Sequence, residues 1–259
     1  MSNQRLEFAK NTAVETGKLL LDHFHYGKHK GEFKSDRTLV TKADRDADQY
    51  IQKLIRDHFP SDAILSEEGN TIFPENADVW VVDPLDGTVN FSLGLHYWGV
   101  SIAHFRHGIP QSAALYFPVI DELYSASAGK GADLNGKRMQ APNPSVDSHY
   151  PIFVHCSRMH GLYNVALPYK TRSLGAAAYH LCLIPKGSAI LAFESTVKLW
   201  DFAGSWLVVK EAGGFIQPVG NQQPFPTQSG FDYNDRSFAI IAAASEDVMN
   251  KATANIIRK

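Results

Sequence analysis

Apolar residues recur every three or four positions in two segments near the N-terminus. The first stripe predicts a helix from Gln4 to His25, and the second predicts a further helix that ends before a proline. Asp44, Asp46 and Asp48 lie near the start of the second helix, where carboxylates favour the helix dipole. For Asp46 and Asp48 we expect no other role. Each helix has one apolar face to bury.

Short apolar runs then replace the helical pattern. The predicted strands of this first half are Ala63–Leu65, Val79–Val82, Tyr97–Phe105, Ser112–Phe117 and Glu122–Ala126. We predict that they form an antiparallel meander packed on the two helices. The run Gly129–Arg138 contains glycines but no G-x-x-x-x-G-K-[ST] pattern, and it predicts a turn.

Strands and helices alternate in the second half, which is typical of an α/β lobe. The predicted strands are Ile152–Cys156, Ala189–Phe193, Phe215–Val219 and Phe238–Ala243, and the predicted helices are Gly175–Leu183, Phe202–Ala212 and one capped by Ser245. The polar, proline-bearing run Ala141–Pro151 is the predicted boundary. It divides the chain into a lobe of residues 1–145 and a lobe of residues 146–259.

Composition narrows the class of protein. The 259 residues are 44% apolar, enough for a sizeable core, and the net charge of -2 gives no bulk field that would attract nucleic acid. Two cysteines, Cys156 and Cys182, cannot form a disulfide framework. The N-terminus has no signal-peptide pattern and no window approaches a membrane span, so we predict a cytoplasmic protein with no membrane contact.

The segment Val79–Phe91, V-W-V-V-D-P-L-D-G-T-V-N-F, places two carboxylates just past a predicted strand. The proline between Asp83 and Asp86 restricts the bend, and carboxylates held together in this way suit Mg²⁺. Gly87 and Thr88 then open a predicted helix, where free N–H groups favour an anion. An ordinary turn explains the same residues equally well, so other acidic positions must decide between the two.

Further acidic candidates lie on both sides of this segment. Glu67 and Glu68 follow a predicted strand, where neighbours point to opposite sides, so at most one of them should face a site beside Asp83. A solvated pair of loop residues is the alternative. Asp201 lies at or near the N-cap of an apolar helix, the usual place of a structural Asp. The small residues 203–205 behind it would nevertheless let this helix end approach a ligand closely.

Three motifs follow one another along the chain: S-E-E-G, D-P-L-D-G-T-V-N-F and L-W-D-F-A-G-S-W-L-V-V-K-E-A-G-G. Their ordered set, from about Thr38 to Gly214, resembles the inositol monophosphatase family, a group of Mg²⁺-dependent, lithium-sensitive phosphatases. The resemblance implies an α+β fold, a layered αβαβα sandwich with an antiparallel N-terminal sheet and a smaller C-terminal α/β lobe. It also implies two or three Mg²⁺ ions and a homodimer.

The resemblance assigns roles to individual residues. The implied metal ligands are Glu67, Asp83, the main-chain carbonyl of Leu85, Asp86 and Asp201. The implied catalytic residues are Glu67 and Thr88, which would orient the attacking water, and Asp44, which would lie near a further, weaker metal. The implied substrate-binding residues are Asp86, Gly87, Thr88, Ala177, Glu194 and Asp201, with Glu194 as a hydroxyl-binding carboxylate.

These roles agree with the chemistry of phosphate monoesters. A phosphate dianion repels a nucleophile, and several carboxylates at one place repel one another, so bound Mg²⁺ and an activated water resolve both problems. We predict direct hydrolysis by that water. The Asp-x-Asp spacing of phosphatases that form an aspartyl phosphate does not occur in the motif around Asp83.

The substrate is less well determined. Glu194 favours a polyol, so we predict an inositol monophosphate. Fructose 1,6-bisphosphate is the second candidate, with Lys170 and Arg172 available for a second phosphate, and related enzymes hydrolyse 3'-phosphoadenosine 5'-phosphate or histidinol phosphate. A regulatory protein-binding or RNA-binding role on the same scaffold is the alternative from another class, although the near-neutral charge argues against it as the only role.

Overall fold

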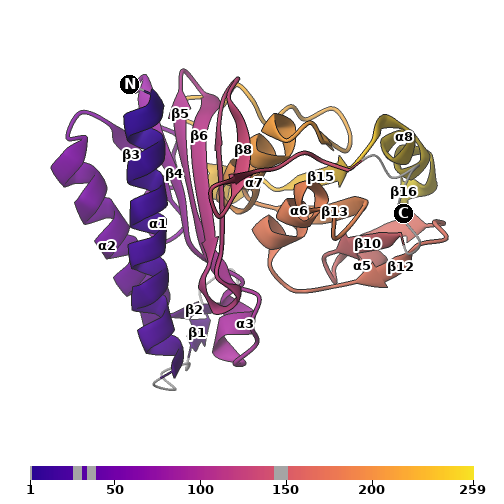
Figure 1. The fold of residues 1–259 in the computed structure, drawn as a ribbon, viewed down its shortest axis with the longest axis horizontal. Helices are drawn as coiled ribbons and strands as arrows, with labels where there is room; N and C mark the ends of the chain where they lie inside the picture. Colours follow the sequence, from indigo (N-terminus) through magenta and orange to yellow (C-terminus); the bar gives the residue numbers. More distant parts are fainter. Residues whose placement is uncertain (1, 26–30, 34–38, 143–150) are drawn as a thin grey trace.

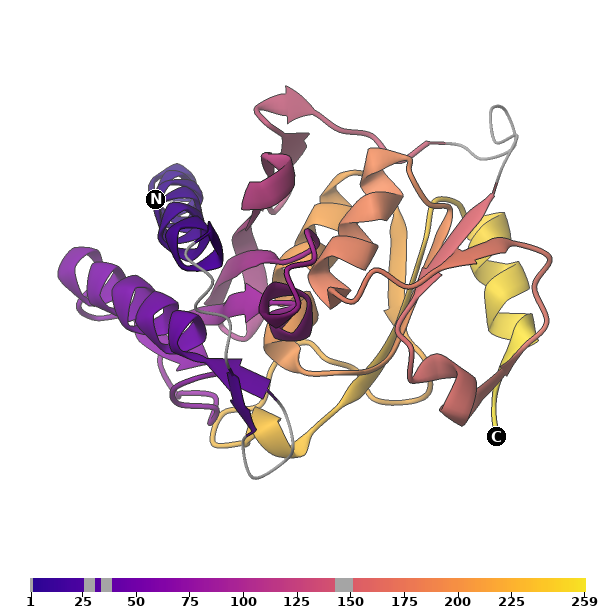
Figure 2. The same ribbon diagram turned by 90° about the horizontal axis from the view of Figure 1, so that it is seen from below.

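The computed structural model describes residues 2–25, 31–33, 39–142 and 151–259, which form five layers (Figure 1). Helices α1 (Ser2–His25) and α2 (Lys42–His58) cover one face of a seven-stranded sheet. Helices α6 (Ala177–Lys186) and α7 (Leu199–Glu211) lie between this sheet and a five-stranded sheet. The short α5 (Met159–Leu162) and α8 (Glu246–Asn255) cover the far side (Figure 2). The predicted αβαβα fold is confirmed.

The first sheet is the predicted antiparallel meander except at its first strand, where the prediction is wrong because the pairing is parallel. Its strands run in sequence order: β3 (Ala63–Ser66), β4 (Asp78–Asp86), β5 (Gly99–Arg106), β6 (Ile109–Phe117), β7 (Glu122–Ser127), β8 (Gly131–Leu134) and β9 (Lys137–Arg138). All neighbours pair antiparallel except β3 and β4, which are parallel. The short helix α3 (Thr88–Ser92) follows β4. Because β3 and β4 run in the same direction, the residues that follow them lie at one edge of the sheet.

The second sheet is mixed. Its order is β12 (Lys170–Arg172), β10 (Ile152–His155), β13 (Leu191–Val197), β15 (Phe238–Ala243) and β14 (Phe215–Pro218). Two small ribbons complete the strands, β1 (Gly31–Phe33) with β2 (Leu39–Thr41) and β11 (Tyr163–Val165) with β16 (Ile256–Arg258). The short 3-10 helices are η1 (Pro118–Ile120) and η2 (Tyr233–Asp235). The predicted strand Phe238–Ala243 has the observed bounds, and Ser245 caps α8 as predicted.

Two apolar cores hold the layers together. One lies between the N-terminal helices and the first sheet and includes the fully buried Trp80 and Trp98. The larger one surrounds α6 and α7 and joins both sheets. Helix α7 is apolar around most of its circumference because it packs on both sheets. Gly204 permits the closest approach, since a Cβ there would lie 2.9 Å from Ser101 Oγ.

The structure corrects the prediction for Gly129–Arg138, which is not a simple turn. Residues 131–138 form the hairpin of β8 and β9, and the chain reverses at Asn135 and Gly136, with φ of 49° and 74°. The dipeptide Asn-Gly favours this left-handed backbone and is a strong hairpin signal. The predicted lobe boundary between residues 145 and 146 lies outside the described residues. None of the described helices is long and apolar enough to cross a membrane.

Candidate metal centre

The centre is built where β3 and β4 end. Ser66 pairs with Val82 in the parallel register, so Glu67 follows at the same level as Asp83. The β4 ladder is irregular between Asp83 and Asp86, and Asp83 Oδ1 accepts a hydrogen bond of 3.0 Å from the Leu85 amide. This local turn fixes the Asp83 carboxylate at the strand end.

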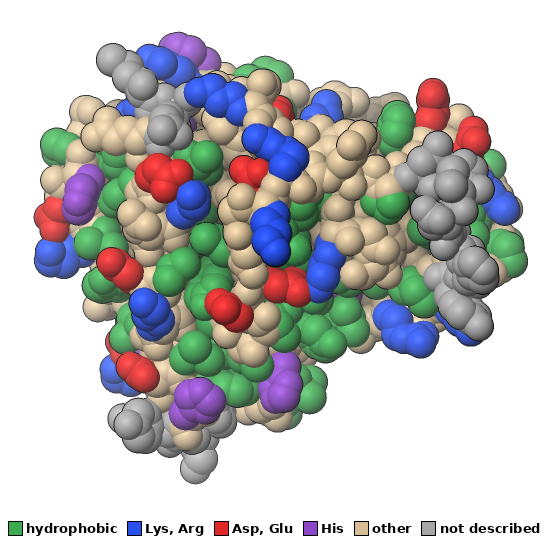
Figure 3. Space-filling model, in the orientation of Figure 1, with side chains coloured by type: hydrophobic (Ala, Val, Ile, Leu, Met, Phe, Trp, Pro, Cys, Tyr) green, Lys and Arg blue, Asp and Glu red, His purple; other side chains and the backbone are tan. Residues whose placement is uncertain are grey.

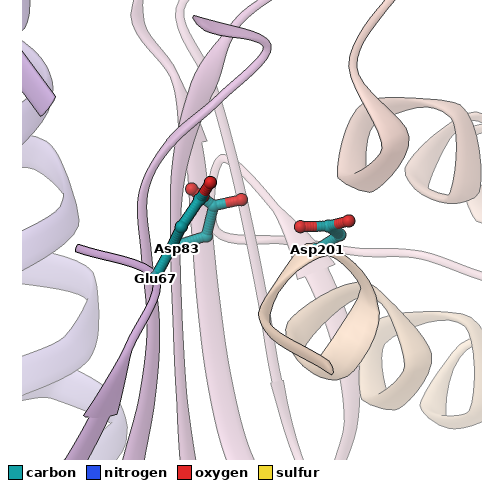
Figure 4. Close-up of side chains that lie close together, drawn as sticks. All are labelled: Glu67, Asp83 and Asp201. Atoms are coloured by element: carbon teal, nitrogen blue, oxygen red, sulfur yellow. The ribbon is translucent and has the colours of Figure 1, made fainter. Parts of the chain in front are cut away.

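Helix α7 brings a third carboxylate from the other side of the first sheet. Glu67, Asp83 and Asp201 each offer an oxygen, and these oxygens all lie within 4.8 Å of one another. In Figure 4, Glu67 and Asp83 project from neighbouring strand ends, and Asp201 faces them from the end of a helix. We call these three residues the acidic trio. They are about 130 residues apart in sequence at most, and only the fold brings them together.

The sequence placed Asp201 at or near the N-cap of its helix, and the structure places it inside the first turn. The N-cap is Lys198, whose backbone amide donates a 2.8 Å hydrogen bond to Asp201 Oδ2. This bond holds the Asp201 side chain at the helix start. One Asp201 oxygen therefore has a structural role, while the carboxylate still lies near those of Glu67 and Asp83.

Burial and mutual repulsion disfavour the ionised form of the acidic trio when no cation is bound. Burial raises the pKa of Asp83 well above its usual value, and the nearby charges of Glu67, Asp86 and Asp201 raise it further. Burial raises the pKa of Asp201 to about 7, with Asp86 adding to the effect. No Lys or Arg of the described chain forms an ion pair with Asp83. Converging carboxylate oxygens that repel one another fit a hard divalent ion such as Mg²⁺.

Asp86 lies beside the trio and is held differently. Its Oδ1 accepts from the Ala177 amide at 3.0 Å, and its Oδ2 accepts from the Ala178 amide at 2.9 Å, both at the start of α6. Burial raises the pKa of Asp86 to about 7 despite these bonds. The structure thus ties this predicted ligand to the helix that carries Ala177, while the trio itself consists of the other three carboxylates.

Thr88 links two of the other predicted residues. Its hydroxyl lies 2.9 Å from Asp44 Oδ1 and 3.1 Å from the Leu85 carbonyl oxygen, so it can donate to either. Asp44 is buried at the third position of α2 and also accepts from the backbone and hydroxyl of Thr41. Burial raises the pKa of Asp44, and the Thr41 hydrogen bonds oppose that shift. Asp46, by contrast, lies beyond the first turn of α2.

Gly87 is the N-cap of α3 and has a φ of 89°, a backbone conformation that favours glycine. A Cβ at this position would also lie 2.9 Å from the Tyr97 carbonyl oxygen. The short helix therefore begins after Gly87, as the sequence predicted, and Thr88 is its first residue.

A cavity of about 310 Å³ adjoins the trio and contains the predicted substrate side. Asp86, Ala177, Glu194 and Asp201 all line it. Asp44 and Thr88 are not among its lining residues, and neither are Lys170 and Arg172, which lie on the exposed strand β12. The lining cation is instead Arg158, whose Nη1 lies 3.1 Å from Thr196 Oγ1.

Sequence reasoning missed the residues that support these groups. Asp48 is buried and accepts hydrogen bonds from Ser66 Oγ at 2.5 Å and from Gln52 at 2.7 Å, so it ties α2 to the strand end before Glu67. Asn90 Nδ2 lies 2.6 Å from the carbonyl oxygens of Tyr97 and Leu174. Nothing local in the sequence distinguishes these residues from surface polar residues.

Comparison with known proteins agrees with this geometry. The sequence profile described as the inositol monophosphatase family matches residues 1–258. The chain belongs to the inositol monophosphatase family. This is a phosphatase family, which supports the hydrolysis of phosphate monoesters as the activity class.

Members of the inositol monophosphatase family with several names are similar to this chain. Inositol monophosphatase 3 of Solanum lycopersicum is 33% identical over 269 residues, covering 96% of both chains. Nus factor SuhB of Pasteurella multocida is 33% identical over 196 residues, 71% of this chain and 73% of the relative. Fructose-1,6-bisphosphatase/inositol-1-monophosphatase of Thermotoga maritima is 28% identical over 235 residues, 89% of this chain and 91% of the relative.

The fold agrees as well. The structure of an IMPase from Thermotoga maritima superimposes with a TM-score of 0.82 at 25% identity, covering 97% of this chain and 96% of that one. The inositol monophosphatase fold is therefore present over almost the whole length.

Proposed function

We propose that this protein is a Mg²⁺-dependent, lithium-sensitive phosphatase that hydrolyses an inositol monophosphate by direct attack of water. The observation that carries the proposal is the acidic trio of Glu67, Asp83 and Asp201 next to a cavity lined by Glu194. The trio suits the phosphate end of the substrate through bound cations, and Glu194 suits the hydroxyl end.

When bound, Mg²⁺ supplies positive charge to phosphate oxygens and lowers the pKa of a coordinated water. We assign Glu67, Asp83, the Leu85 carbonyl, Asp86 and Asp201 as the residues that hold two or three such ions. The amides of Gly87 and Thr88, at the start of α3, would add hydrogen bonds to the phosphate. These assignments follow the family pattern.

Thr88 orients the water in this proposal. Its hydroxyl donates a hydrogen bond to Asp44 or to the Leu85 carbonyl, which leaves the oxygen lone pairs available to accept a hydrogen bond from the water. Glu67 accepts the other proton of that water, as a general base within the trio. Asp44 thus fixes the rotation of the Thr88 hydroxyl.

Glu194 would bind a hydroxyl group of the substrate. It is 1% exposed, lies on β13 and lines the cavity together with the Ala177 segment. A buried carboxylate accepts hydrogen bonds from hydroxyl groups and disfavours a second phosphate at the same place. This preference supports an inositol monophosphate.

Fructose 1,6-bisphosphate is the second candidate, and Arg158 supports it. Arg158 lines the cavity, and its guanidinium would suit a second phosphate. Lys170 and Arg172, the cations proposed from sequence, are outside the lining. Fructose bisphosphate turnover that depends on Arg158 would favour this candidate.

The test is phosphate release by the purified protein in Mg²⁺, with EDTA as the blank. Inositol 1-phosphate, fructose 1,6-bisphosphate, 3'-phosphoadenosine 5'-phosphate, histidinol phosphate and phenyl phosphate are compared, with and without Li⁺. We expect Mg²⁺-dependent release that Li⁺ inhibits, with inositol 1-phosphate the preferred substrate. Folded protein that releases no phosphate from any of them would contradict the proposal.

Folded protein that hydrolyses none of these esters would favour the alternative, a regulatory protein-binding or RNA-binding role. On the face in Figure 3, Lys and Arg side chains are interspersed with Asp and Glu, and this pattern does not favour binding of nucleic acid at that face. The homodimer and the cytoplasmic location stay predictions. Sedimentation equilibrium of the purified protein would test the homodimer.

A further inference from the structure

We propose that His180 is a positioning residue that fixes Glu194 for recognition of substrate hydroxyl groups. The inference rests on the proposed function and extends it to a residue outside the family pattern described above. His180 lies in the first turns of α6, Glu194 lies on β13, and both line the cavity. Each is 1% exposed.

The hydrogen bonds of His180 determine which nitrogen carries the proton. The Leu174 amide donates to His180 Nε2 at 2.8 Å, so Nε2 must be the acceptor. The proton of the neutral ring is then on Nδ1, which lies 2.5 Å from Glu194 Oε1. The backbone amide thus donates to the imidazole, and the imidazole donates to the carboxylate, in one series of hydrogen bonds.

This series of hydrogen bonds strongly constrains the side chain of Glu194. A Glu side chain has three rotatable bonds, and a buried carboxylate with one fixed oxygen loses most of that freedom. Within the described chain, His180 is the side chain that hydrogen-bonds Glu194, and the bond uses Oε1. The second oxygen, Oε2, has no hydrogen bond to a described residue and remains for a ligand that can donate one.

The same imidazole also holds the wall of the cavity. Its acceptor bond fixes the amide of Leu174, and Asn90 Nδ2 fixes the carbonyl oxygen of Leu174 at 2.6 Å. The neighbours on either side, Ser173 and Gly175, line the cavity. His180 therefore sets both the carboxylate and the adjacent loop, and these two effects must be separated by experiment.

Two conservative variants separate the effect of His180 on Glu194 from its effect on the loop at Leu174. In His180→Asn, the amide nitrogen stands near the position of Nδ1 and can donate to Glu194, but the side chain is too short to accept from Leu174. In His180→Gln, the amide oxygen reaches the position of Nε2 and can accept from Leu174, but no donor faces Glu194. The pair is matched because each variant retains one of the two bonds.

The measurement is the ratio of kcat/KM for inositol 1-phosphate to kcat/KM for phenyl phosphate, which has no hydroxyl on its ring. Because a charge-assisted hydrogen bond orients Glu194, we expect the ratio to fall about tenfold in His180→Gln, mainly through KM for inositol 1-phosphate. His180→Asn should keep the ratio within about threefold of wild type. In a Glu194→Gln background, His180→Gln should have no further effect on the ratio.

A spectroscopic readout is independent of turnover. The Nδ1 proton of His180 should give a downfield proton resonance in the wild-type protein that disappears in Glu194→Gln. Absence of that resonance in the wild type would overturn the inference. So would an equal fall of the kcat/KM ratio in both His180 variants, or a further fall of that ratio when His180→Gln is added to Glu194→Gln. Wild-type protein that hydrolyses neither phosphate ester would instead contradict the proposed function, while the resonance still decides the His180 bond.

Discussion

The acidic trio lies beside the cavity and the single carboxylate Glu194 lines it, and the protein holds the two in different ways. The acidic trio has three carboxylates that repel one another, and among the described residues no Lys or Arg forms an ion pair with Asp83. Glu194 has a neutral imidazole donor at 2.5 Å. Buried carboxylates that repel one another suit an external cation, and a single carboxylate held by one hydrogen-bond donor suits a further donor from the substrate.

The largest effect should come from breaking the trio at its most buried member. Asp83→Asn keeps the shape and removes a metal-binding charge, so we expect kcat/KM to fall at least about 1000-fold. Thermal denaturation in EDTA should show a melting temperature no lower than that of wild type, because repulsion with Glu67 is relieved. The control is Glu68→Gln, which changes a neighbouring acid outside the trio and should leave turnover near that of wild type. Full activity of Asp83→Asn would contradict the metal assignment.

A smaller loss should follow from Thr88→Ala. This change removes the hydroxyl that lies between Asp44 and the proposed water, so we expect kcat to fall about 100-fold with little change in KM. Thr88→Ser keeps the hydroxyl and should recover most of the loss. A Thr88→Ser variant as slow as Thr88→Ala would show that the methyl group matters instead of the hydroxyl.

The pH dependence of stability should sharpen the comparison. The pKa of Asp86 and of Asp201 is raised from 3.8 to about 7 in the folded protein, first by burial. Between these values the folded state binds more protons than the unfolded state, so the metal-free protein loses stability as the pH rises. Mg²⁺ competes with those protons, and its stabilising effect should grow over the same interval.

Thermal denaturation in EDTA and in Mg²⁺, at about pH 5.5 and about pH 8, checks this expectation. The increase in melting temperature caused by Mg²⁺ should be larger at the higher pH. The same increase at both values would show that these carboxylates do not bind the ion.

The smallest effect should come from the support behind Glu67. Ser66→Ala removes the donor to the buried Asp48, and we expect a loss of about 1 to 3 kcal/mol in the free energy of unfolding. Ser112→Ala is the matched control, because the buried Ser112 hydroxyl has no hydrogen-bond partner among the described residues. Chemical denaturation should separate the two variants. Equal stabilities would show that the Asp48 bond contributes nothing.

Much of the fold could be predicted because its signals are local. Helical periodicity gave α1 and α2, and a serine followed by two acidic residues gave the cap of α8. The hairpin at Asn135 and Gly136 was also signalled locally, by the Asn-Gly dipeptide, but the glycine-rich surroundings were interpreted as a turn.

The candidate site divides in the same way. Glu67, Asp83 and Asp201 occur in recognisable motifs, so they could be named before their oxygens were shown to converge. Asp48 and His180 gain their importance from partners 18 and 14 residues away, across different elements. Burial and tertiary pairing make them important, and no spacing rule in the sequence reports either.

The most direct test of the metal centre is anomalous diffraction from a crystal of the protein loaded with Mn²⁺ in place of Mg²⁺. We expect anomalous density between the carboxylates of Glu67, Asp83 and Asp201, with coordination by Asp83. A fully loaded crystal with no density there, or with density only at other carboxylates, would contradict the account.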